Sequence, residues 1–187
     1  MRRARRRVSI GTELVAIVPE LVAGYVKWVD GTLAEEVLRP ITEDYDPKAL
    51  RASLGDVDPA QWPRGEDGRA HDPWKEAAYL PMKDLKTGAK YTFATSSIGG
   101  TRVVKHLCGQ YAWQLRAAPE TTAGHLPVVQ LGARSYKHAD RKRGTIYNPT
   151  FTGVDWVLDK NNDASAASSS FANHRPEKQK KRRKASL

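Results

Sequence analysis

Short apolar stretches separated by turn residues make up most of the chain. Several alternate between apolar and polar positions, as expected for half-buried strands, and one is almost continuously apolar, as expected for a well-buried strand. Asp30-Gly31 is a turn signal near the end of the first of these stretches, and Gly88 can supply the left-handed residue of a hairpin turn between the second and the third. The pattern predicts five strands, at 23–33, 76–83, 90–95, 126–133 and 146–157.

The stretch between the third and fourth of these strands has a helical period instead. Ser96 and Ser97 precede it and can cap the free backbone N–H groups of a helix start. Three strands, a helix and two strands are the order of the OB-fold, a small barrel that commonly binds single-stranded nucleic acid. We therefore predict a mainly β domain, an OB-like five-stranded barrel with one helix between strands 3 and 4. The apolar positions that predict the helix are Val103, Val104, Leu107, Cys108, Tyr111 and Leu115.

The remaining residues divide into one insertion and two tails. Residues 34–75 are acidic, contain five prolines and show no clear strand, so we expect an insertion after the first strand. Residues 13–21 predict a short helix, which Pro19 limits. The basic residues 1–12 and the Ser-, Ala- and Lys-rich residues 161–187 have compositions typical of disordered tails. The predicted domain therefore covers residues 13–160.

The formal net charge of +10 is unevenly distributed along the chain. Residues 8–76 hold fourteen acidic and seven basic residues, whereas residues 77–160 hold five acidic and twelve basic ones. A field of one sign over a folded surface attracts polyanions, so the basic half favours nucleic-acid binding. The alternative is that the two halves neutralise each other across an internal interface.

A run of cations precedes the last predicted strand. Five basic residues within 134–143 cannot all be buried, so this predicted loop, 134–144, either is solvated or binds an anion such as phosphate. Single strands are also held by aromatic side chains on which bases stack. Alternation places Tyr91 and Phe93 on the same face of their strand without showing whether that face is core or surface. The candidate DNA-binding residues are Lys27, Trp28, Tyr79, Lys83, Tyr91, Arg134, Tyr136, Lys137, Arg141, Lys142 and Arg143.

Other chemistry has less support. The single cysteine, Cys108, excludes an intramolecular disulfide and fits a reducing cytoplasm. His106, His125 and His138 have no zinc-site spacing, and no nucleophile motif or P-loop is present. No stretch reaches the roughly 18–20 apolar residues of a membrane span. We therefore expect no catalysis, metal, cofactor or membrane partner.

Several short motifs resemble those of a known group of proteins. Asp72-Pro73-Trp74, Thr92–Ser97 with Gly99-Gly100, and Ser135–His138 resemble uncharacterised proteins encoded in bacterial genomes, often in phage-like neighbourhoods. The resemblance covers about 25–160 and implies a location in the cytoplasm of a bacterial host cell, without an established activity. In element order the chain also resembles OB-fold single-stranded DNA-binding proteins. Bacterial members of that class typically end in an acidic tail, whereas the last residues here include the basic run 180–184.

Together these features favour a non-catalytic single-stranded DNA-binding protein that acts in replication or recombination of phage or mobile-element DNA. The alternative is a protein-interaction factor, such as a phage-encoded inhibitor of a host replication or recombination protein, that uses the acidic insertion 34–75. In a third interpretation the basic tails alone bind nucleic acid, and the domain is only a scaffold.

Overall fold

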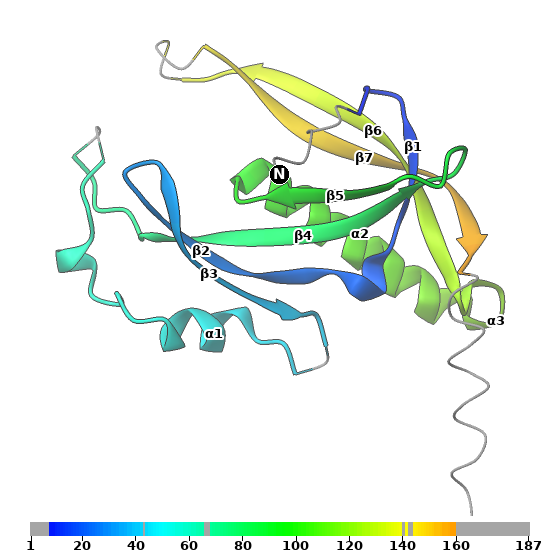
Figure 1. Cartoon of the computed structure of the whole chain (residues 1–187), viewed down its shortest axis with the longest axis horizontal. Coiled ribbons are helices and arrows are strands. Elements are labelled where there is room, and N and C mark those ends of the chain that lie inside the picture. The colour runs from blue at the N-terminus through cyan, green and yellow to red at the C-terminus, as the bar shows by residue number, and fades with distance from the viewer. Residues whose placement is uncertain (1–7, 43, 66–67, 140, 142–143, 160–187) are drawn as a thin grey trace, which may run out of the picture.

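One open sheet of seven antiparallel strands forms the body of the molecule (Figure 1). The computed structural model describes residues 8–42, 44–65, 68–139, 141 and 144–159. The α-helices are α1 (Pro47–Ser53), α2 (Ile98–Ala117) and α3 (Pro119–Thr122), and the short 3-10 helices are η1 (Val18–Glu20) and η2 (Pro59–Gln61). The strands are β1 (Glu13–Ala16), β2 (Val22–Val29), β3 (Thr32–Pro40), β4 (Trp74–Asp84), β5 (Lys90–Thr95), β6 (His125–Lys137) and β7 (Thr145–Leu158).

The sheet has the order β3-β2-β4-β1-β6-β7, and β5 pairs with β4. β1 and β2 both pair with β4, through Ala16↔Met82 and Val22↔Tyr79 among other positions. They therefore occupy consecutive parts of one position in the sheet, interrupted by η1. Among the described strands no backbone pairing joins β5 to β7, so the sheet does not close into a barrel.

Local sequence explains the main turns and the start of α2. Asp30 and Gly31 have φ values of 50° and 73°, the left-handed conformation that a tight turn between β2 and β3 needs. Ser97 is the residue before α2, and its Oγ accepts the Gly100 N–H at 3.0 Å. The predicted turn at Asp30-Gly31 and the predicted serine cap at the start of the helix are both confirmed.

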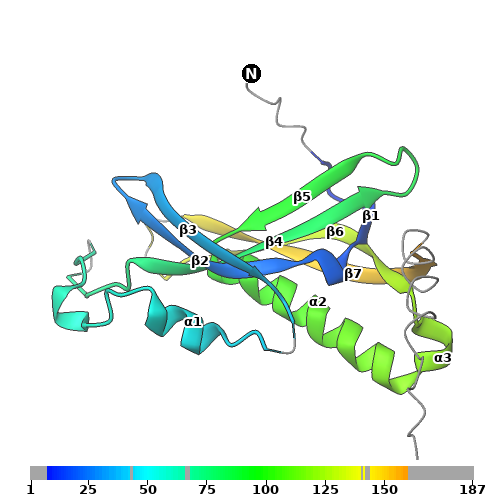
Figure 2. The same ribbon diagram turned by 60° about the horizontal axis from the view of Figure 1, so that its bottom comes forward.

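The core lies between the sheet and α2. Leu14, Leu80 and Val129 are at most 1% exposed, and α2 adds Val104 and Leu107 to the same cluster. Burial of such a side chain stabilises the fold by about 1.5–3 kcal/mol. Figure 2 shows α1 and α2 on the same side of the sheet. The helical period at 101–115 correctly predicted which side of α2 is buried.

Two predictions about the strands were wrong. The described residues form seven strands rather than five. One of the two added strands is β3, which residues 32–40 form along β2. Residues 13–16 form β1 instead of a helix, because Leu14 and Val15 lie in the middle of the sheet, paired with both β4 and β6. The chain also joins the fold before residue 13, since the Gly11 N–H donates to the Leu131 carbonyl at 2.7 Å.

The predicted basic loop 134–144 is largely a continuation of the β6–β7 hairpin. Arg134–Lys137 belong to β6, and Ser135 pairs with Tyr147 of β7. The loop prediction was wrong for residues 134–137, because β6 continues to Lys137, which pairs with Thr145 of β7. Lys142, Arg143 and the tails at 1–7 and 160–187 lie outside the described residues.

Candidate nucleic-acid interface

The β6–β7 hairpin extends beyond the core. Leu131 and Phe151 are the last facing pair that packs against the core cluster, and Ala133–Lys137 beyond them are exposed. We call residues 133–149 the distal hairpin. Figure 1 shows it projecting from the sheet at the upper left, with the tip of the acidic insertion below it at the same end of the molecule.

The cations of the distal hairpin are available to a ligand. Arg134, Lys137 and Arg141 are exposed, and the structure gives none of the three an ion-pair partner among the described residues. Tyr136 and Tyr147 are 50% and 70% exposed, far above what a core tyrosine shows. Cations and exposed aromatic rings together are the combination that holds nucleic-acid strands.

Register divides these residues between the two faces of the hairpin. Ser135 lies opposite Tyr147, which puts Tyr147 and Lys137 on one face. Arg134 lies opposite Asn148, so Arg134, Tyr136 and Asn148 share the other face. Each face thus carries one aromatic ring and one cation.

The distal hairpin contacts the start of α2. A Cβ on Gly99 would overlap the Asn148 carboxamide, so the hairpin and the first turn of the helix lie in direct contact. A cleft of about 820 Å³ opens between the start of α2 and the start of β4. Its walls include Lys75, Ile98 and Arg102, together with Lys105, which pairs with Glu76 at 2.5 Å. The sequence prediction missed Lys75 and Arg102, because neither belongs to a run of cations.

Lys27 is held in an internal network. Its Nζ lies 2.8 Å from Asp56 Oδ2 and 3.5 Å from Glu35 Oε1, and 5.7 Å above the Trp74 ring. The hydrogen bond to Asp56 raises the pKa of Lys27. Two carboxylates therefore already neutralise this cation, and the structure gives it a role in attaching the acidic insertion to the sheet.

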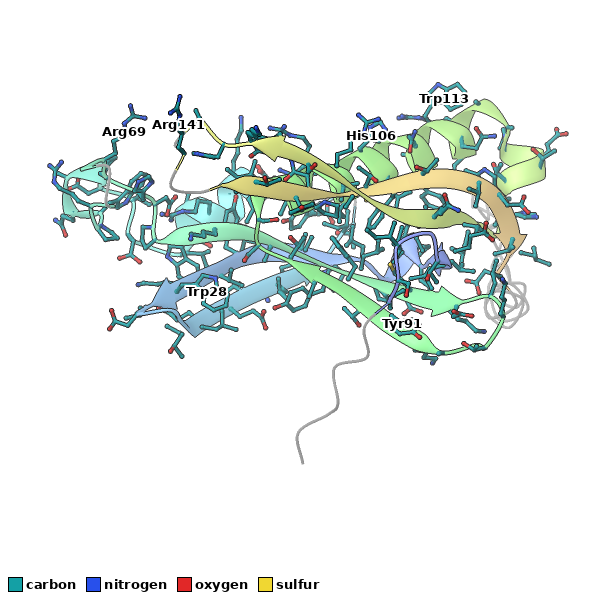
Figure 3. All side chains as sticks on the ribbon, turned by 90° about the horizontal axis from the view of Figure 1, so that it is seen from above. Trp28, Arg69, Tyr91, His106, Trp113 and Arg141 are labelled. Carbon is teal, nitrogen blue, oxygen red and sulfur yellow. The ribbon has the colours of Figure 1, made fainter. Side chains whose placement is uncertain are left out.

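The other strand candidates are spread over the molecule. Tyr91 packs against the core cluster together with Phe93, which agrees with the predicted shared face and places that face inside. Tyr79 donates its hydroxyl to Glu36 across the sheet, and Lys83 is exposed near the far end of β4. Trp28 is 42% exposed. Figure 3 shows Arg69, Arg141, His106 and Trp113 along one side of the molecule and Trp28 and Tyr91 on the other.

Many carboxylates of the acidic insertion have structural partners. Asp46 and Asp58 accept backbone N–H groups at the starts of α1 and η2. Asp72 accepts two hydrogen bonds from Arg51, at 2.7 and 2.8 Å. Asp56 binds Lys27 and the Trp74 Nε1, and these hydrogen bonds lower its pKa. Many carboxylates of the acidic insertion therefore stabilise the fold of the insertion itself through hydrogen bonds and ion pairs.

The described residues contain no group of three or more His, Cys, Asp or Glu placed to hold a metal ion. Burial raises the pKa of the Cys108 thiol, so a smaller fraction of it is present as thiolate at neutral pH. None of the helices in the described ranges has the length and apolar character needed to cross a membrane. No known family model matches the chain, and no curated protein or solved structure is significantly similar to it.

Proposed function

We propose that the protein binds single-stranded DNA without catalysis, with the distal hairpin as its main contact, in replication or recombination of phage or mobile-element DNA. The feature that carries the proposal is the set of three exposed cations and two exposed tyrosines on a hairpin that projects from the core. Exposed tyrosines favour single strands, because the bases of a duplex are already stacked on one another.

The arrangement of strands supports an OB-like interpretation. If β1 and β2 are counted as one bent strand, then β4, β5, α2, β6 and β7 follow it in the order of an OB-fold. The acidic insertion then corresponds to the loop between strands 1 and 2, and the distal hairpin to the loop between strands 4 and 5. These are the two loops with which OB-folds commonly grip a ligand, and both lie at the same end of the molecule (Figure 1).

The test compares two triple variants of the full chain. The first variant changes Arg134, Lys137 and Arg141 to alanine. The control variant changes Lys48, Lys86 and Lys90 to alanine, which are three exposed lysines outside the distal hairpin. Affinity for a labelled single strand is measured by fluorescence anisotropy across a salt series. We expect the first variant to bind more weakly and to lower the slope of log Kd against log salt by about 2, since each lost phosphate contact contributes about 0.7. The control should keep the slope.

Equal behaviour of the two variants would contradict the proposal. If both keep the slope of the unaltered protein, the tails carry the binding and the distal hairpin does not. The protein-interaction alternative makes a different prediction: no measurable preference for single strands, and capture of a protein partner that is lost when residues 36–70 are deleted. Preference for single strands that disappears in Tyr136→Ala and Tyr147→Ala would exclude that alternative.

A further inference from the structure

The outer face of α2 carries a straight row of exposed residues. Positions 102, 106, 109, 113 and 116 are spaced four, three, four and three apart, so they lie along one line of the helix, opposite its buried residues Val104 and Leu107. All five are exposed. We call Arg102, His106, Gly109, Trp113 and Arg116 the α2 outer face.

Trp113 is the aromatic residue of this face, and its ring is open to solvent. It is 62% exposed, which is unusual for a tryptophan. Of its neighbours three and four residues away, Gln110 and Arg116 have long side chains that are themselves exposed. Gly109 and Ala117 are small, and a Cβ on Gly109 would find nothing within 4 Å. Small neighbours leave the indole face uncovered, as a platform for stacking requires.

The charge of the helix has one sign. Residues 98–117 contain Arg102, Lys105 and Arg116 and no acidic residue. Lys105 is paired with Glu76, but the structure gives Arg102 and Arg116 no ion-pair partner among the described residues. An exposed ring between unpaired cations matches a polyanion that also has flat rings to stack.

The α2 outer face is continuous with the distal hairpin. Asn148, on the hairpin face of Arg134 and Tyr136, touches Gly99 at the start of α2. The wall of the cleft of about 820 Å³ includes Ile98, the residue before Gly99 in the first turn of α2, and Arg102. Figure 3 shows Arg141, His106 and Trp113 on the same side of the molecule.

We propose that a single strand bound at the distal hairpin continues past Asn148 and the cleft onto the α2 outer face, where a base stacks on Trp113 and phosphates contact Arg102 and Arg116. This inference rests on the proposed function, and it adds a second contact site outside the loops and strands that OB-folds commonly use. From Arg102 to Arg116 the helix rises about 21 Å at 1.5 Å per residue, so only a strand of several nucleotides can reach both sites.

The experiment measures the Kd of full-chain variants for two labelled single strands, of about 6 and about 20 nucleotides, within and beyond the usual site size of one OB-fold. Trp113→Ala should raise the Kd of the longer strand about fivefold or more and leave the Kd of the shorter strand unchanged, whereas Trp113→Phe should restore most of the affinity. Arg102→Ala with Arg116→Ala should lower the salt slope of the longer strand by about 1.4. Leu85→Ala, which removes an exposed apolar side chain from the turn after β4, is the control and should change neither Kd. Trp28→Ala, which removes an exposed tryptophan on the other side of the molecule, tests a path along that side.

The outcomes separate this inference from the proposed function. One outcome is that the Arg134, Lys137 and Arg141 variant raises the Kd of both strands, with no change of Kd in Trp113→Ala or in the variant of Arg102 and Arg116. In that case the path over α2 is wrong and the distal hairpin site stands. If Trp28→Ala raises the Kd of the longer strand and Trp113→Ala does not, the bound strand leaves the distal hairpin along the opposite side of the molecule. An unchanged Kd in the distal hairpin variant overturns the proposed function itself. Equal loss for both strand lengths in Trp113→Ala also contradicts a second, length-dependent site.

Discussion

At the scale of single residues, hydrogen bonding decides which candidate side chains are available to a ligand. Lys27 and Tyr79 attract attention in the sequence as a cation and an aromatic ring on predicted strands. Their partners lie far from them in sequence: Asp56 reaches Lys27 from the segment between α1 and η2, and Glu36 of β3 reaches Tyr79 of β4 across β2. Sequence alternation could place Tyr91 and Phe93 on one face, but only the position of α2 shows that this face is the core.

Tyr79 gives a pH prediction. The hydrogen bond to the Glu36 carboxylate, with burial, raises the pKa of Tyr79 to about 12 from an ordinary value of 10.0. Because the folded value is the higher one, this interaction stabilises the fold fully below about pH 10 and is lost as the pH rises towards about 12. We expect the difference in unfolding free energy between the unaltered protein and Tyr79→Phe to shrink over that range, measured by urea unfolding at several pH values. A difference that stays constant from pH 9 to about pH 12 would show that the bond does not form.

At the scale of elements, the strands that sequence predicts are those with a regular pattern. β3 was missed because little of it is buried and because a bulge at Ala34 shifts the alternation between Leu33 and Glu35. β1 was missed because its apolar run is short and buried on both faces, and such a run cannot be distinguished from a helix by periodicity. The outer face of α2 also has a signal in the sequence, because residues 98–117 contain no acid. The apolar spacing that predicts the helix does not include this signal.

Two glycines of α2 give a matched prediction about its attachment to the hairpin. A Cβ on Gly99 would overlap the Asn148 side chain, whereas one on Gly109 would meet nothing within 4 Å. Gly109→Ala should therefore raise the unfolding free energy by about 0.5–1 kcal/mol, the usual gain at an exposed helical site. Gly99→Ala should gain less than this or lose stability, because the Asn148 carboxamide has to move away from the new Cβ.

Urea unfolding measures both effects, and a second substitution identifies the cause of the Gly99 effect. Asn148→Ala removes the amide that a Cβ would meet, so the double variant should recover most of the stability that Gly99→Ala loses. If Gly99→Ala stabilises the protein as much as Gly109→Ala, and Asn148→Ala changes nothing in the double variant, then the hairpin does not rest on the start of α2 as described.

At the scale of the whole molecule, side chains connect the two ends of the sheet that backbone pairing leaves open. Among the described strands β5 and β7 share no backbone pairing, yet the rings of Phe93 and Phe151 meet edge to face, with centroids 5.0 Å apart at 75°. Sequence could predict the order of the five strands and the helix, because each element has a local signature. It could not predict closure, because closure depends on the curvature of the sheet and on how far apart two remote edges finish.

The Phe93–Phe151 contact predicts a measurable coupling across this opening. Edge-to-face aromatic pairs contribute about 0.5–1.5 kcal/mol beyond the burial of their surfaces. A double-mutant cycle with Phe93→Leu and Phe151→Leu, followed by urea unfolding, should return a coupling energy in that range, because leucine keeps most of the apolar volume and removes the ring pair. Hydrogen exchange should show the amides of β5 opening faster in each variant than those of β4, which is paired on both sides. A coupling energy near zero would mean that the two rings do not connect β5 to β7. Equal protection in β4 and β5 would mean that backbone contacts close the sheet and that the opening between β5 and β7 does not exist in solution.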